Sequence, residues 1–196
     1  MSARDAILGA LRAAAVPAFP RPPAPAATRL ADPVAAFLES VKAVGGASAR
    51  VPDVAALDAA LRALPVWAEA RRTVSLVPGA GASTVDLAAV ADPHDLEGLE
   101  VAVLPGALGV AENGAVWLPG SSLGPHRAVF VIPEHLVLVV RAADVVDDMQ
   151  AAYARLEIER PGYGVFVSGP SKTADIEQSL VIGAHGPRSC TAFVVG

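Results

Sequence analysis

Small polar residues gather in the segment that follows the apolar run at residues 164–167. A glycine, three hydroxyl side chains and one cation stand close together there: Ser168, Gly169, Ser171, Lys172 and Thr173. Asp175 then opens the sequence Asp-Ile-Glu, which predicts the start of a helix. Backbone N–H groups at such a loop and helix start attract anions, so we expect these residues to bind an anionic ligand or a partner. In the alternative interpretation, Asp175 caps the helix, satisfies the same N–H groups and makes the loop structural.

A histidine between small residues ends this part of the chain, in the sequence Gly-Ala-His-Gly-Pro at residues 183–187. His185 is a candidate general acid or base, and Gly186 and Arg188 are candidate ligand-binding residues, with Arg188 suited to a carboxylate. The alternatives are a histidine that bonds to a backbone carbonyl and an arginine that faces water. No second histidine, cysteine or carboxylate stands at metal-ligand spacing, so we expect no metal site.

A second candidate site is the sequence Ala-Glu-Asn-Gly at residues 111–114, directly before an apolar strand. The pair Asn113-Gly114 is typical of a tight turn with positive φ. Such a turn presents Glu112 at the tip of a sheet as a nucleophile or general base, with Asn113 and Gly114 as ligand-binding residues. The alternative is a glutamate that bonds to local N–H groups or faces water. We expect the Glu112 turn and the segment at 168–187 to face each other across one crevice.

Short apolar runs alternate with helical patterns along the body of the chain, and this alternation predicts an α/β fold. The sheet should be mostly parallel and Rossmann-like, with helices on both faces. Ligands then bind beyond the carboxyl ends of the strands, at the loops after Val77, Leu104 and Val167. Strands close together within residues 115–140 predict a small antiparallel or mixed insertion. The strands are expected at 47–51, 73–77, 100–104, 115–118, 127–132, 136–140, 164–168 and 191–195, and helices at 32–44, 53–64 and 144–156.

The N-terminal part differs in composition from this body. Residues 1–15 read as a short amphipathic helix, because Ser2 and Asp5 resemble a capping box and Ile7, Leu8 and Leu11 share one face. A proline-rich linker follows at 16–31, and the α/β domain occupies 32–196. The helix is therefore an arm that docks on its own body or on a neighbouring subunit, or else a loosely held terminus.

The composition of the 196 residues excludes several classes of protein. A hydrophobic fraction of 53% supports a sizeable core, and a net charge of -5 with scattered basic residues argues against nucleic acid as a partner. No stretch has the length and hydropathy of a membrane span, and no signal peptide is evident. The single cysteine, Cys190, forms no intrachain disulfide and does not hold an iron–sulfur cluster. We expect a cytoplasmic protein without an intrinsic cofactor.

The motifs at residues 168–177 and 183–187 resemble the C-terminal signature of the lactate-utilisation protein C family, which carries the LUD domain. The turn at 111–114 is similar to that family's Ala-Glu-Thr-Gly, although Asn113 replaces the threonine, and Lys172 stands where arginine is commoner. The resemblance extends over nearly the whole chain. It implies a fold related to ribose-5-phosphate isomerase, glucosamine-phosphate deaminase and the CoA-transferases. It also implies a subunit of a system that oxidises L-lactate to pyruvate, with iron–sulfur clusters only on the partner proteins.

Two other functions remain open at this point. The sequence Glu-Asn-Gly at residues 112–114 is similar to the Ser-Glu-Asn-Gly turn of CoA-transferases, in which the glutamate forms a thioester, although Ala111 replaces the serine. An independent enzyme acting on acyl-CoA or sugar phosphates through Glu112 is therefore one alternative. A ligand-sensing or structural module is the other. The small anionic ligand that the loop at residues 168–173 would bind is a carboxylate or a phosphate.

Overall fold

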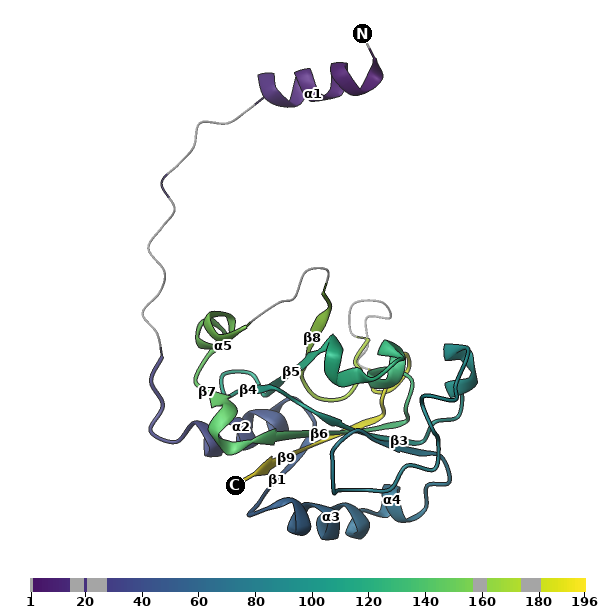
Figure 1. Cartoon of the computed structure of the whole chain (residues 1–196). Helices are drawn as coiled ribbons and strands as arrows, with labels where there is room; N and C mark the ends of the chain where they lie inside the picture. The colour runs from purple at the N-terminus through teal and green to yellow at the C-terminus, as the bar shows by residue number, and fades with distance from the viewer. Residues whose placement is uncertain (1, 15–19, 21–27, 157–161, 174–180) are drawn as a thin grey trace.

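A parallel sheet of five strands forms the centre of the computed structural model, which describes residues 2–14, 20, 28–156, 162–173 and 181–196. The strand order is β1-β9-β6-β3-β2, and every neighbouring pair is parallel (Figure 1). The apolar runs expected from the sequence supply these strands, because a strand covered on both faces needs apolar side chains at successive positions. Their bounds are β1 (Ala47–Val51), β2 (Thr73–Ser75), β3 (Val101–Pro105), β6 (His135–Arg141) and β9 (Ser189–Val195).

Helices cover both faces of this sheet, as the sequence predicts. Helices α3 (Val54–Ala63) and α4 (Pro65–Ala68) cover one face, where Leu57 and Leu61 pack against Val101 and Val103 (Figure 1). Helix α2 (Pro33–Ala43) covers the other face, in one core cluster with Ala102 and Leu104. Asp32 and Asp53 are the N-caps of α2 and α3. Alternate residues of each strand therefore serve two separate cores.

A second, mixed sheet packs on the α2 side of the molecule. Its order is β7-β4-β5-β8, in which β5 pairs antiparallel with both β4 and β8, and β4 pairs parallel with β7. Helix α5 (Met149–Arg155) packs on it, and Ala152 shares a core cluster with Trp117. The bounds are β4 (Leu108–Val110), β5 (Ala115–Pro119), β7 (Val145–Val146) and β8 (Gly164–Val167). A second, mixed sheet was predicted, but of the strands expected within residues 115–140 only β5 belongs to it.

Three local predictions were wrong. The apolar run at 127–132 is not a strand but the 3₁₀ helix η3 (Arg127–Phe130), which buries Val129 in the core. The helix expected at 144–156 begins at Met149, after the 3₁₀ helix η4 (Ala142–Asp144) and β7. Strand β6, which we assigned to the mixed insertion, is the central strand of the parallel sheet. Apolar content alone does not distinguish these structures, because η3, β6 and β7 all bury apolar side chains.

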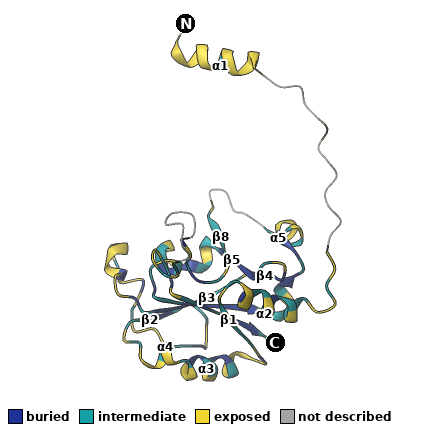
Figure 2. Ribbon diagram, turned by 180° about the vertical axis from the view of Figure 1, so that it is seen from behind, coloured by how far each residue is buried: buried dark blue, intermediate teal, exposed yellow. Residues whose placement is uncertain are grey.

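Helix α1 (Ala3–Ala13) has the capping box between Ser2 and Asp5 that the sequence predicts. None of its residues is buried (Figure 2). Most of the proline-rich linker and the helix expected after Asp175 lie outside the described residues. Two further 3₁₀ helices are η1 (Pro93–Leu96) and η2 (Gly120–Leu123). No helix in the described segments has the length and apolar character needed to cross a membrane.

Candidate functional site

The two C-terminal motifs lie at the edge of the parallel sheet where its strands begin. Residues 183–188 lead directly into β9, and Glu134 leads directly into β6. A cavity of about 650 Å³ opens at this edge, between these residues and η1. The sequence had led us to expect ligands at the opposite edge, beyond the carboxyl ends of the strands. That expectation took 168–187 as a loop that follows a strand, whereas residues 183–188 precede one.

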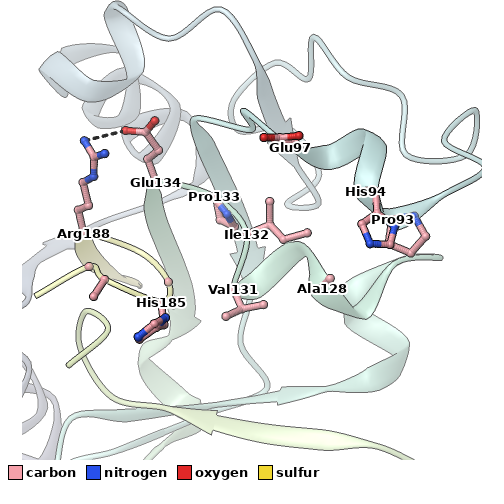
Figure 3. A pocket seen from close by; sticks show the side chains of 13 residues that line it. Pro93, His94, Glu97, Ala128, Val131, Ile132, Pro133, Glu134, His185 and Arg188 are labelled. Atoms are coloured by element: carbon pink, nitrogen blue, oxygen red, sulfur yellow. Dashed lines mark ion pairs between the residues drawn. The ribbon is translucent and has the colours of Figure 1, made fainter. Parts of the chain in front are cut away.

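The 650 Å³ cavity has an apolar wall and a charged rim (Figure 3). Ala128, Val131 and Ile132 form part of the wall, next to Pro93 and Pro133. Arg188 forms an ion pair with Glu134, with 3.2 Å between Nη1 and Oε2, and its backbone N–H donates to the Glu134 carbonyl at 2.7 Å. His185 is exposed at the same cavity. The predicted residues His185, Gly186 and Arg188 therefore share one site.

A smaller cavity of about 260 Å³ lies beside it, between β8 and η3. Ser168, Gly169 and Ser171 line this cavity together with Gly186, and Val131 and Gly186 line both cavities. Backbone hydrogen bonds hold the two motifs together: Ser171 N–H donates to the Pro187 carbonyl and Gly183 N–H donates to the Ser171 carbonyl, each at 3.0 Å. The structure thus brings residues 168–171 and 183–187 into one surface.

The turn at residues 111–114 contacts this surface through Asn113, but the Glu112 carboxylate lies against α5. Ser168 Oγ donates to the Asn113 carbonyl at 2.8 Å. The Glu112 carboxylate instead accepts from the backbone N–H of Met149 at 3.0 Å, at the start of α5. Glu112 lines neither of these two cavities, which gives no support to the crevice that we expected between Glu112 and Ser171. Its role as nucleophile or base remains a prediction.

The turn at residues 111–114 and the loop that begins at Ser168 both pack closely against the C-terminal half of α2. Gly114 has a φ of +65°, and a Cβ there would lie 2.7 Å from the backbone nitrogen of Val41. Gly169 has a φ of +70°, and a Cβ there would lie 2.7 Å from the Val44 carbonyl oxygen. Ser40 Oγ donates to the Ala111 carbonyl at 2.6 Å. Glycine is needed at the two positions for conformation and for space.

Lys172, the cation predicted to bind an anionic ligand, forms a hydrogen bond within the protein. Lys172 Nζ donates to the carbonyl of Val44, the C-cap residue of α2, and lines neither cavity. Thr173 is buried, and its N–H and Oγ1 both donate to the Val181 carbonyl, at 3.2 and 3.4 Å. Asp175 lies outside the described residues. The part of the loop that is described therefore favours the structural interpretation for Lys172 and Thr173.

Cys190 does not suit an iron–sulfur cluster or a nucleophile. Its side chain is 2% exposed, and burial raises the pKa of the thiol to about 12. Clusters and reactions both need the thiolate, which such a pKa disfavours. Among the described residues, no group of three or more histidine, cysteine, aspartate or glutamate side chains is placed to hold a metal ion.

Three polar residues of the larger cavity were not predicted from the sequence to belong to a site: His94, in a segment interpreted as a helix start, Glu97 and Glu134. The Asp92 carboxylate raises the pKa of His94 by accepting a hydrogen bond from its ring, with 2.6 Å between Asp92 Oδ1 and His94 Nδ1. Glu134 follows Pro133 in a short polar interruption of two apolar runs. That interruption is the one signal in the sequence that could have indicated Glu134. No sequence pattern indicates that residues 92–97 lie near residue 188 in the fold.

Comparisons with known proteins agree with the resemblance of these motifs. Residues 100–195 match the LUD domain. Lactate utilization protein C of Geobacillus kaustophilus (strain HTA426) is 32% identical over 180 residues, which span 86% of this chain and 70% of that protein. Proteins of the same name from Geobacillus sp. (strain WCH70) and Shouchella clausii (strain KSM-K16) are 38% and 37% identical. These two matches span 44% of this chain and only 38% and 39% of the relatives.

The fold also has a counterpart among solved structures. A DUF162 family protein from Deinococcus radiodurans superposes with a TM-score of 0.59 at 20% identity, over 85% of this chain and 98% of that one. At this identity the similarity shows the fold alone. The long match to the Geobacillus kaustophilus protein and the LUD domain match together show that the chain belongs to the LUD domain family of lactate utilization protein C.

Proposed function

We propose that this chain takes part in lactate utilisation, as one component of a system that oxidises L-lactate to pyruvate together with iron–sulfur proteins. The observation that carries the proposal is the similarity to a lactate utilization protein C across 86% of the chain. Because the match includes the body as well as the C-terminal motifs, it supports a common role better than a shared motif would.

The chemistry of the chain supports a system in which other proteins accept the electrons. Oxidation of a hydroxy acid needs a group that accepts electrons, and proteins use a cofactor for this step. The sequence carries no dinucleotide fingerprint, and its single thiol is buried with a raised pKa. In the proposed function the clusters therefore belong to the partner proteins, and this chain binds the substrate or contacts those partners.

The larger cavity is the proposed place for a small carboxylate. Arg188 offers a planar guanidinium that binds a carboxylate through paired hydrogen bonds, and in this structure it pairs with Glu134. A substrate carboxylate would replace that of Glu134. His185, on the same cavity, would exchange a proton with the substrate hydroxyl.

Anaerobic affinity purification of the tagged chain from its own cells tests this proposal. Iron content and lactate-dependent dye reduction are measured on the eluate. Co-purified iron and lactate-dependent activity are the expected result, and an iron-free, inactive eluate would count against the proposal.

Two variants then separate substrate binding from assembly. Arg188→Ala should abolish dye reduction while iron still co-purifies. Arg62→Ala is the matched control, because Arg62 is an ion-paired arginine of α3 whose side chain is 66% exposed, against 67% for Arg188. Equal activity of the two variants would remove Arg188 from the substrate site.

A further inference from the structure

Two residues, Val131 and Gly186, line both the 650 Å³ cavity and the 260 Å³ cavity. Because Gly186 has no side chain, the space between the two cavities is not filled at this position. A Cβ there would lie 3.1 Å from Ser171 Cβ and 3.5 Å from Val131 Cγ2, and would narrow the junction. The two cavities are therefore adjoining parts of one hollow, with Gly186 at the junction.

The two parts of this hollow differ in chemistry. The larger cavity carries His185 and the ion pair between Arg188 and Glu134. Apolar side chains line the smaller cavity: Phe130, Val131, Leu136, Val165 and Val167. Among the described residues that line the smaller cavity, none is charged, and its polar side chains are the hydroxyls of Ser168 and Ser171. One end of the hollow therefore suits the charged group of a ligand, and the other end suits an apolar group.

Strand β8 supplies one apolar side of the smaller cavity. Successive side chains of a strand point to opposite faces, so Val165 and Val167 share one face and Phe166 lies on the other. The Phe166 ring packs against Trp117, with 4.7 Å between the ring centroids. Val165 and Val167 pack instead against the same core cluster as Phe130, and all three remain half-buried. An apolar group of a ligand would remove this surface from water, which favours binding.

L-lactate alone is small for a hollow of this size. With the bulk of about four water molecules, at about 30 Å³ each, it fills roughly 120 Å³. The larger cavity has a volume of about 650 Å³, and the smaller one adds apolar space beyond Gly186. Ligand sites commonly enclose most of the surface of the ligand that they bind. A hydroxy acid with a longer apolar side chain meets this condition better than lactate does.

We propose that the site accepts 2-hydroxy acids with branched aliphatic or aromatic side chains, and that L-lactate is the smallest member of this substrate class. The proposal rests on the proposed function, which assigns the substrate carboxylate to Arg188 and its hydroxyl to His185. The side chain of the acid then passes Val131 and Gly186 and lies in the smaller cavity.

Titration calorimetry of the full chain with two acids tests this proposal. L-lactate and L-2-hydroxyisocaproate share the carboxylate and the hydroxyl, and they differ in a methyl against an isobutyl side chain. One methylene in an apolar pocket changes selection by about tenfold or more, so 2-hydroxyisocaproate should bind at least about tenfold more tightly than L-lactate. Equal affinity, tighter binding of L-lactate, or no binding of either acid would overturn the proposal.

Substitutions of Val165 test whether the smaller cavity holds the side chain. Val165→Phe fills this cavity from β8 and should bring the affinities for the two acids close together. Val165→Ala enlarges it and should improve the binding of L-phenyllactate relative to 2-hydroxyisocaproate. Thermal unfolding shows whether each variant folds, and Val165→Ala provides a second test if Val165→Phe does not fold.

Val34→Phe is the matched control for Val165→Phe. Val34 is a half-buried valine of α2 that packs against the same core cluster and lines neither cavity. The ratio of the two affinities should therefore be that of the native chain. A ratio that changes as much in Val34→Phe as in Val165→Phe would contradict a side-chain site in the smaller cavity.

The proposed function and this wider substrate class fail by different results. An iron-free, inactive eluate in the affinity purification counts against the role in lactate oxidation, whatever the ratio of affinities. An eluate that contains iron and oxidises lactate, together with equal affinity of the chain for the two acids, would overturn the wider substrate class alone.

Discussion

Gly114 holds the turn at residues 111–114 against helix α2. Its φ of +65° disfavours other residues, and the backbone of Val41 leaves no room for a Cβ. Gly114→Ala should therefore lower the free energy of unfolding by more than the cost of backbone strain alone, about 2–4 kcal/mol in total. Urea unfolding followed by circular dichroism measures this loss.

Gly98 offers a matched control for that substitution. Its φ is +75°, but the nearest atom to an added Cβ is the Arg72 side-chain Cδ, at 4.0 Å. Gly98→Ala should cost only the backbone strain, about 1 kcal/mol. Equal losses in the two variants would show that the contact between the turn and α2 does not determine the geometry of this site.

Cys190 predicts a specific dependence of stability on pH. The thiol ionises near its ordinary pKa of 9.0 in the unfolded chain but only near 12 in the folded protein, because it is buried. Between these values the unfolded state binds fewer protons, so the free energy of unfolding falls by about 1.4 kcal/mol per pH unit. Below pH 9 the contribution of the protonated thiol is fully present.

The variant Cys190→Ala isolates this term from other groups that titrate at alkaline pH. The difference in unfolding free energy between the native chain and the variant should be constant up to about pH 8.5 and then shrink. Urea unfolding at several pH values measures it. A difference that stays constant to pH 10.5 would contradict a raised pKa of Cys190.

At the scale of elements, the apolar strands and the capped helices are predictable from the sequence. Asp32 and Asp53 mark the starts of α2 and α3, and uninterrupted apolar runs mark β3, β6 and β9. Strand β4 was missed because its three residues include a glycine and carry no pattern. Local patterns do not encode the order of the strands in the sheet. They therefore do not show which edge of the sheet carries the cavity.

The candidate site was predictable only where its residues are neighbours in sequence. Ser168, Ser171 and Gly186 were found and do line one cavity. His94 and Glu97 were missed because they reach the cavity from η1, a separate element that lies there through tertiary packing. Glu112 was recognised as the tip of a turn, but the sequence does not show that its carboxylate faces α5.

The connection between β7 and α5 anchors the chain segment that precedes α2. Asp148 accepts from the N–H groups of Ala151 at 2.8 Å and Thr28 at 2.9 Å, and Asp147 accepts from Leu30 at 2.8 Å. The bond from Ala151, followed by the bond from Thr28, lowers the pKa of Asp148. The anchoring is therefore fully present above the ordinary pKa of aspartate and is lost as the pH falls through the lowered value.

Amide hydrogen exchange distinguishes the two aspartates. Asp148→Asn should speed exchange at Thr28 and Ala151, because a neutral amide is a weaker acceptor than a carboxylate. Asp147→Asn should speed exchange at Leu30 alone, and so serves as the control for a general loosening of the region. Faster exchange at all three amides in both variants would mean that the segment and α5 open as one unit.

At the scale of the whole molecule, helix α1 buries none of its residues, whereas the body contains three core clusters. Removing residues 2–27 from a dilute sample should therefore leave the midpoint of thermal unfolding within about 2 °C of the full chain. Removing residues 2–30 should lower it by about 5 °C, because the bonds from Thr28 and Leu30 and the packing of Leu30 on the core are lost. Scanning calorimetry measures both midpoints. If the shorter deletion lowered the midpoint as much as the longer one, α1 would have to pack on its own body.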